Sequence, residues 1–511
     1  MPQVDQQPPN SAGPADAASA RGRHATPQGQ GFGRVVGWTI LGSIVPGTGL
    51  LIAGRRTAGR SVLGLAGAVL LALGATALFL DPIASARTML SNPDSFLLVA
   101  LVLAAVAAGW SVLIVRTHIS LREYADLTNV QRHLCSLLVV SLIGIVLVPT
   151  AQAANYAWVT RETLKSVFDG GDDIAGASRT IDAKAHDPWA AHPRWNVLVL
   201  GGDDGKGRIG IRPDTIIMAS IDTRTGNTTL VSLPRNLEHV PFPEGTPQAQ
   251  DFPDGFYCLE GGVNKECLLN GIWNWAEENK AKYYPNEENA GLTATVEAVR
   301  VVTGIQSDDY IILNLRGFRD FITAIGGIEI NVRRRLPIGA NVEKNIPASG
   351  YIEAGRQTLG GYHALWYARS RSDSSDFERM QRQRCVINAV VEKSEPQTLA
   401  ANFTGIMAAV GKNLHTSIKT SELDAWTELA MRVKKGKIKS IAVTDQVVNT
   451  ARPDFDKIRS LVVQAIAHGA ASPRTPVPSA PTGSKPAVPP TGTSGNSPGK
   501  DVAEDVKGVC S

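Results

Sequence analysis

The sequence predicts an α/β fold: a three-layer α-β-α domain with a mixed central sheet, preceded by an N-terminal helical membrane anchor. Long uncharged apolar runs are confined to the part of the chain before residue 155. Between residues 195 and 470, short apolar runs typical of strands alternate with segments whose apolar residues recur at helical spacing. Strands interleaved with helices imply a layered domain with a mixed sheet.

Length and charge limit the classes of function. The chain has 511 residues, which leaves room for two or three domains. It carries 51 basic and 47 acidic residues, a net charge of +4, so it lacks the strong overall positive charge of a nucleic-acid-binding protein. Any anion-binding site must therefore be local. Residues 1–33 are rich in Pro, Gln, Gly and Ala and are expected to form a disordered cytoplasmic tail.

The membrane region is expected at residues 34–154. Three uncharged apolar runs, at residues 61–80, 96–115 and 134–154, reach the length of about 20 residues that a spanning helix needs. Three arginines lie between the second and third runs: Arg116, Arg122 and Arg132. Because positive loops stay in the cytoplasm, the third run leads outward and everything after residue 154 is extracytoplasmic.

A fourth apolar run, at residues 35–53, contains Pro46, Gly47 and Gly49 and has arginines on both flanks. Two cytoplasmic flanks predict a segment that enters the membrane and returns, or that lies in the interface. The alternative is a fourth crossing with an external N-terminus.

The extracytoplasmic domain is expected at residues 195–470, after a stalk at residues 155–194. Strands are expected at residues 196–200, 215–221, 228–233, 309–315, 327–332 and 438–443. Helices are expected at residues 293–302, 317–324, 377–392 and 453–467. Residues 471–511 are dominated by Pro, Ser, Thr, Gly and Ala for most of their length, so they are expected to form a disordered tail.

Four cysteines are extracytoplasmic by this topology: Cys258, Cys267, Cys385 and Cys510. An oxidising compartment favours two disulfides among them, with three connectivities open. Zinc binding is disfavoured, because the sequence has no closely spaced Cys pair with adjacent histidines. Cys135 lies at the start of a membrane run and is expected to be an unpaired core thiol.

Two aspartates are candidate metal ligands. Asp203 follows the first expected strand, at the end where α/β sheets usually bind ligands, and Asp214 immediately precedes the second. If the two strands are neighbours, both carboxylates could hold one Mg²⁺ or Mn²⁺ ion together with phosphate oxygens. Turn or capping aspartates are the alternative. Three arginines close by in the sequence favour the metal: Arg208, Arg212 and Arg235.

A second block of charged residues lies near residue 375. Arg369 and Arg371 are two residues apart, so in an extended segment their side chains point the same way. Four more side chains recur at spacings of three and four and would share one helix face: Asp376, Arg379, Arg382 and Gln383. A solvated, salt-bridged helix face is the ordinary alternative. Because arginine forks bind phosphate oxygens two at a time, a pyrophosphate substrate explains both blocks.

Five pieces of the chain form an ordered motif set, at residues 196–204, 208–215, 232–235, 367–371 and 375–384. This order resembles the LytR–CpsA–Psr family, whose members move glycopolymers from polyprenyl-pyrophosphate carriers onto peptidoglycan. The resemblance covers roughly residues 195–392. It implies the same three-layer fold with a long apolar pocket for a lipid tail. It also implies three partners: the lipid-linked glycopolymer, peptidoglycan and the membrane, and no nucleic acid.

The resemblance implies roles for matching positions. Asp203 and Asp214 would hold the metal. Six side chains would grip the pyrophosphate: Arg212, Arg235, Arg369, Arg371, Arg379 and Gln383. Arg208 and Arg382 are further substrate-binding candidates, and Asp376 is a candidate general base, with a salt bridge to Arg379 as its alternative role. The sequence departs from the family pattern at Asn236, where Asp is usual, and around residues 256–275, where a Lys-x-Asn segment is expected.

These residues predict a phosphotransferase, a glycopolymer–peptidoglycan ligase, acting on a wall polymer such as arabinogalactan or teichoic acid. Direct in-line attack needs no nucleophilic triad, because metal and arginines stabilise the charge. Two alternatives remain: a polyprenyl-pyrophosphate-directed pyrophosphatase, and a non-catalytic, membrane-tethered wall-binding or regulatory protein. The expected location is the cell membrane, multi-pass, with the catalytic domain extracytoplasmic.

Overall fold

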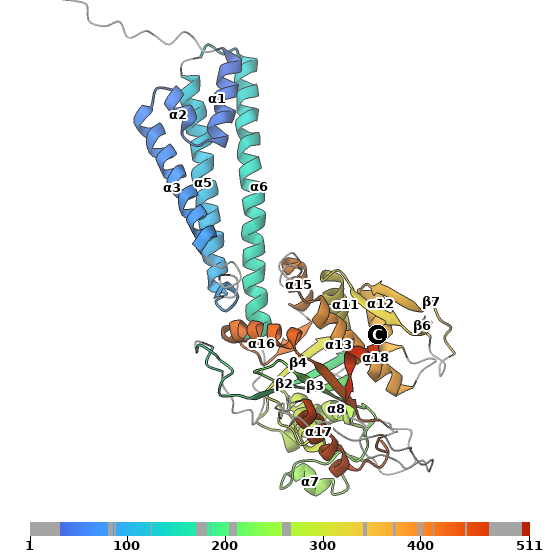
Figure 1. Cartoon of the computed structure of the whole chain (residues 1–511). Coiled ribbons are helices and arrows are strands. Elements are labelled where there is room, and N and C mark those ends of the chain that lie inside the picture. The colour runs from blue at the N-terminus through green and yellow to red at the C-terminus, as the bar shows by residue number, and fades with distance from the viewer. Residues whose placement is uncertain are drawn as a thin grey trace, which may run out of the picture. The chain divides into compact units, whose positions relative to one another are not determined.

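The computed structural model divides into two compact units (Figure 1). The first comprises residues 1–79 and 101–154, and the second residues 80–100 and 155–511. The structure describes residues 31–79, 85, 88–123, 125–169, 181–183, 185–203, 212–257, 267–340, 345–370, 375–395, 398, 402–411, 413–444, 447–469 and 503–510.

The first unit is helical. The apolar run at residues 35–53 forms two short helices, α1 (Phe32–Ile44) and α2 (Thr48–Ile52), rather than one. Gly47 lies between them with a φ of 96°, a conformation that favours glycine. Neither helix reaches the length of about 20 residues that a crossing requires. The break is consistent with the predicted re-entrant segment, which stays a prediction.

The three longer apolar runs are also helical: α3 (Arg56–Phe79), α5 (Asp94–Arg122) and α6 (Asn129–Phe168). Among the described residues, α5 and α6 are long and apolar enough to cross a membrane. Large apolar side chains such as Leu98 and Leu137 are mostly exposed on their surfaces. Exposed apolar surface of this extent is typical of helices that contact lipid. A third span through α3 stays a prediction.

The second unit is built on a seven-stranded sheet with strand order β11-β10-β3-β2-β1-β4-β9. β3 pairs parallel with β10 and β1 pairs parallel with β4, whereas the other neighbours are antiparallel. The predicted mixed sheet is therefore confirmed. Its strands are β1 (Arg194–Asp203), β2 (Arg212–Asp222), β3 (Thr228–Leu233), β4 (Asp309–Asn314), β9 (Leu414–Thr416), β10 (Ile438–Ala442) and β11 (Glu504–Asp505).

Helices cover both faces of this sheet. Successive strand residues point to opposite faces, so one strand contributes side chains to two separate cores. Leu198 and Leu200 of β1 join a core with α8 (Ile272–Glu278), α10 (Ala290–Thr303) and α17 (Phe455–Gly469). Val197 joins a different core, and two helices close the sheet on that face: α13 (Asp376–Lys393) and α16 (Leu423–Lys435). The predicted three-layer α-β-α arrangement is confirmed (Figure 1).

A smaller layer lies beside α13, and it contains one of the predicted strands. The strand expected at residues 327–332 is β5 (Ile328–Val332), but it pairs with β8 (Gly355–Leu359) outside the central sheet. A second small pair joins β6 (Leu336–Ile338) and β7 (Gly350–Ile352). The remaining elements are α7 (Pro247–Asp251), η1 (Leu269–Gly271), α9 (Lys280–Tyr283), α11 (Leu315–Ala324), α12 (Gly361–Arg369), α15 (Phe403–Val410), η2 (Thr420–Glu422) and α18 (Val506–Cys510).

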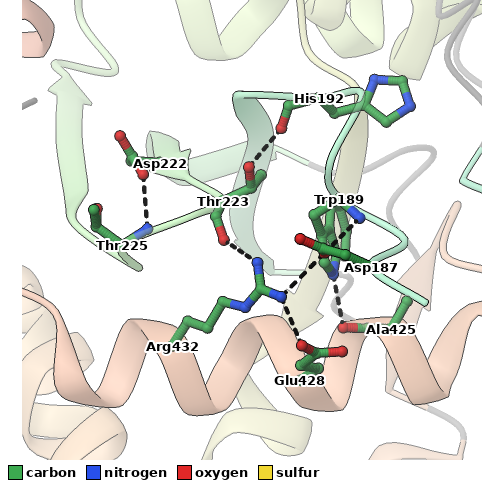
Figure 2. A network of polar contacts seen from close by, with 9 residues as sticks. All are labelled: Asp187, Trp189, His192, Asp222, Thr223, Thr225, Ala425, Glu428 and Arg432. Atoms are coloured by element: carbon green, nitrogen blue, oxygen red, sulfur yellow. Dashed lines mark hydrogen bonds and ion pairs between the residues drawn. The ribbon is translucent and has the colours of Figure 1, made fainter. Parts of the chain in front are cut away.

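The predicted stalk begins as helix, because α6 continues to Phe168. The segment that leads into β1 is fixed to α16 by a polar network (Figure 2). Arg432 donates to the Thr223 carbonyl at 2.7 Å and to Asp187 Oδ1 at 3.1 Å. The buried Trp189 donates its ring Nε1 to the Ala425 carbonyl at 3.0 Å. These contacts fix residues 187–189, near the end of the predicted stalk, to the second unit.

Residues 503–510 are folded, contrary to the prediction of a disordered tail over residues 471–511. β11 pairs with the sheet edge at β10, and a disulfide joins Cys510 of α18 to Cys385 of α13. Residues 471–502 lie outside the described part of the chain. Cys267 is also disulfide-bonded, Cys258 lies outside the described residues, and Cys135 is a buried free thiol as predicted.

Removing the disulfide with Cys510→Ser should lower the free energy of unfolding by as much as about 5 kcal/mol. The bridge joins residues 125 apart in sequence, so its loss frees a large loop in the unfolded chain. Urea unfolding of the full chain in detergent measures the change. Lys507→Ala, at an exposed position of the same short helix, is the matched control. Equal midpoints for Cys510→Ser and Lys507→Ala would contradict a stabilising role.

Candidate active site

A cavity of about 270 Å³ lies between the sheet and the helices α11, α12 and α13. Its wall is mostly apolar, with side chains from three strands and three helices. They include Val199, Ile217, Leu313, Phe318, Phe321, Leu365, Val386 and Val390. Such a wall suits a hydrocarbon ligand, because burying each CH₂ group contributes about 0.8 kcal/mol.

Four of the predicted site residues line the same cavity: Asp214, Arg369, Arg379 and Gln383. Arg379 is 4% exposed, whereas Arg369 is exposed. Asp214 comes from β2 and the others from α12 and α13, so folding brings together the two blocks that the sequence suggested. The cavity thus combines an apolar wall with a charged group of residues, an arrangement that fits an amphipathic anion.

Asp214 forms an ion pair with Arg235. Arg235 Nη1 lies 2.6 Å from Asp214 Oδ1, and both side chains are partly exposed. The contact arises because β2 and β3 are neighbours, and Arg235 follows β3 directly after Pro234. Arg212 lies at the start of β2, opposite Asp203 of β1 in the strand pairing. The first block is therefore assembled across three adjacent strands.

Not every predicted site residue can be placed. Arg208 and Arg371 lie outside the described residues. For Asp203 and Asp376, the structure places the backbone only, at the end of β1 and the start of α13. Among the side chains that the structure describes, no three His, Cys, Asp or Glu residues form a group that could hold a metal ion.

Arg369 corrects a prediction about local structure. It is the last residue of the helix α12 rather than part of an extended segment. Gly361, Ala364 and Tyr367 are the buried residues of this helix, at the spacing of three that one helix face requires. The three-residue spacing of these positions is present in the sequence and is typical of a helix.

Arg382 also differs from its prediction of a shared face. Arg379 and Gln383 line the cavity, but Arg382 is 7% exposed and donates its Nε to the Tyr367 carbonyl at 2.7 Å. Consecutive residues lie about 100° apart around a helix, so Arg382 points away from the cavity that Gln383 lines. Burial raises the pKa of the Tyr367 hydroxyl, and the nearby Arg382 partly opposes that shift.

Thr215 is a site residue that the sequence reasoning missed. Gln383 Nε2 donates to Thr215 Oγ1 at 2.9 Å, and both residues line the cavity. Thr215 and Asp214 are consecutive, so regular alternation would send them to opposite faces. The register shift between Gly201 and Gly202 of β1 interrupts that alternation where both residues lie.

A model of the LytR–CpsA–Psr family matches residues 172–464, more than half of the chain. The chain belongs to this family. A relative from Enterococcus faecalis, named polyisoprenyl-teichoic acid–peptidoglycan teichoic acid transferase TagU, is 28% identical over 253 residues, 48% of this chain and 68% of the relative. TagU of Bacillus subtilis is 24% identical over 286 residues, 55% of this chain and 77% of the relative.

The crystal structure of B. subtilis TagV shares 22% identity with this chain at a TM-score of 0.36, covering 55% of this chain and 98% of that chain.

The family model begins at residue 172 and thus includes the lead-in segment before β1. The predicted membership of the LytR–CpsA–Psr family is confirmed, over a longer stretch than the five motifs occupy.

Proposed function

We propose that this LytR–CpsA–Psr protein transfers a phosphate-linked glycopolymer from a polyprenyl-pyrophosphate carrier to a hydroxyl of peptidoglycan. The cavity supports the proposal most strongly, because its apolar wall would accept the prenyl chain and its charged residues would accept the pyrophosphate. The names of the teichoic acid transferases that resemble the chain support the same reaction type. The polymer would be a teichoic acid or an arabinogalactan.

The arginines would bind and polarise the pyrophosphate. Arg369 and Arg379 line the cavity, and their guanidinium forks match phosphate oxygens. The acceptor hydroxyl would attack the phosphorus that carries the sugar. The bond from that phosphorus to the bridging oxygen breaks, and polyprenyl phosphate leaves. The hydroxyl proton would pass to a base, for which Asp376 at the start of α13 stays our candidate.

Asp203 and Asp214 would hold a divalent cation. The pairing of β1 with β2 places both residues on adjacent strands at the same end, and Asp214 lines the cavity. Mg²⁺ is commonly bound by one or two carboxylates, with water and substrate phosphate as further ligands, so the donor set fits. When bound, the ion would neutralise negative charge on the phosphates.

The helices of the first unit support a proposal about the location. The apolar α5 and α6 support a membrane anchor, and α6 runs directly toward the catalytic domain in the sequence. We propose a multi-pass anchor with the catalytic domain outside the cytoplasm, where peptidoglycan is present. Its disulfides suit that compartment.

Incubating the full chain in detergent with a labelled polyprenyl-pyrophosphoryl saccharide and a peptidoglycan oligomer tests the function. Label should reach the oligomer, EDTA should abolish the transfer, and added Mg²⁺ or Mn²⁺ should restore it. Release of free phosphosaccharide without transfer would favour a pyrophosphatase. Binding without turnover would favour a wall-binding or regulatory protein.

A further inference from the structure

We infer that Arg382 is a positioning residue, which holds the end of α12 so that Arg369 faces the pyrophosphate; the inference rests on the proposed function. Arg382 belongs to α13 and is almost fully buried. It reaches across to α12, where its Nε donates to the Tyr367 carbonyl at 2.7 Å and its Nη2 donates to the Ser370 carbonyl. These two carbonyls stand on either side of Arg369 in the chain.

The carbonyls at the end of α12 need such partners. The last carbonyl groups of a helix receive no hydrogen bond from an N–H group of the same helix, and they carry a partial negative charge. Gln383, the next residue of α13, adds a weaker contact from its Nε2 to the Ala368 carbonyl at 3.5 Å. Two adjacent residues of α13 thus donate to three carbonyls around Arg369, those of Tyr367, Ala368 and Ser370.

Ser370 secures the same point from the other side. It is 4% exposed, and its hydroxyl donates to the carbonyl of Pro337 in β6 at 2.9 Å. The backbone just after Arg369 is therefore held by both α13 and the small sheet. Arg369 itself is exposed and lines the cavity, with its guanidinium carbon 5.9 Å from the centre of the Trp366 ring. A fixed backbone with an exposed side chain suits a residue that must meet a ligand.

Arg382 does not line this cavity. It lines a separate, polar cavity of about 130 Å³, which is bordered by other residues of α13, by Tyr367 and by the Cys385–Cys510 disulfide. Its guanidinium therefore acts on the reaction through Arg369 rather than by direct contact with the substrate.

A double-mutant cycle tests this assignment. Arg382→Lys, Arg369→Ala and the double variant are compared with the wild-type full chain for transfer rate and for binding of polyprenyl pyrophosphate. A lysine is a single-point donor and cannot bind both carbonyls. We expect Arg382→Lys to lower kcat about tenfold or more in the wild-type background and to change it less than twofold in the Arg369→Ala background. Arg334→Lys, in the same polar cavity, is the matched control.

Three outcomes would overturn the assignment. Equal losses in both backgrounds would mean that Arg382 acts independently of Arg369. An unchanged rate in Arg382→Lys would mean that the capping contacts do not matter. A wild-type chain that binds no polyprenyl pyrophosphate would remove the proposed function together with the inference, whereas a failed cycle in an active chain removes the inference alone. Rescue of Arg382→Ala by added guanidinium would support it.

Discussion

Replacing Arg369 by alanine should lower kcat/KM for glycopolymer transfer by about 10- to 150-fold while the protein stays folded. A hydrogen bond to a charged group contributes about 1.5–3 kcal/mol, which corresponds to that range of rates. Arg369 is exposed and ends α12, so its truncation creates no buried cavity. Initial rates with the labelled lipid-linked saccharide, together with a thermal unfolding curve, measure both expectations.

Arg356→Ala is the matched control for this substitution. Arg356 belongs to the same domain, its side chain is 81% exposed, and it pairs with Glu329 on the surface away from the cavity lining. Arg379→Ala should also impair transfer, although its burial makes the unfolding curve essential there. Near-normal rates in both Arg369→Ala and Arg379→Ala would refute the assignment of the pyrophosphate site.

Filling the cavity with Ala368→Phe should weaken the binding of long-chain donors and spare short-chain donors. Ala368 lines the cavity on α12, and a phenyl ring there would occupy space that the prenyl chain needs. Each CH₂ group excluded from the cavity costs about 0.8 kcal/mol, so affinity for a long polyprenyl pyrophosphate should fall by about tenfold or more. Calorimetric titration with carriers of increasing chain length measures the effect.

The control for Ala368→Phe is Ala190→Phe, at an exposed position outside the cavity lining. It should leave the affinity for every carrier unchanged. If Ala368→Phe weakened short and long carriers equally, the ring would be disturbing the pyrophosphate contacts rather than the lipid. If neither carrier were affected, the lipid chain would bind elsewhere.

The local elements of the catalytic domain were largely predictable. The strands at residues 196–200, 215–221 and 228–233 and the helix at residues 377–392 correspond to β1, β2, β3 and α13. Their apolar residues follow the periods of two and 3.6 that a half-buried strand or helix requires. The helix α12 was not predicted, because the two-residue spacing of Arg369 and Arg371 also fits an extended segment.

The C-terminal segment shows a different limit of sequence reasoning. Residues 503–510 follow a long stretch without apolar periodicity, and nothing in their composition indicates a strand or a helix. Their structure depends on partners far away in the chain, namely the edge of β10 and the thiol of Cys385. The disulfide connectivity likewise depends on which cysteines lie close together in space, and the spacing of the cysteines along the sequence does not show this.

Residue type and local period were enough to predict the family, the layered α/β domain, the apolar N-terminal region and the two charged blocks. Which charged residues meet depends instead on the packing of distant elements. Asp214 pairs with Arg235 because β2 and β3 are neighbours, and Arg379 enters the cavity while Arg382, three residues later, supports α12. The apolar wall also depends on the fold. Its residues come from separate strands and helices, where apolar side chains ordinarily pack into a core, and only the folded arrangement leaves a cavity between them.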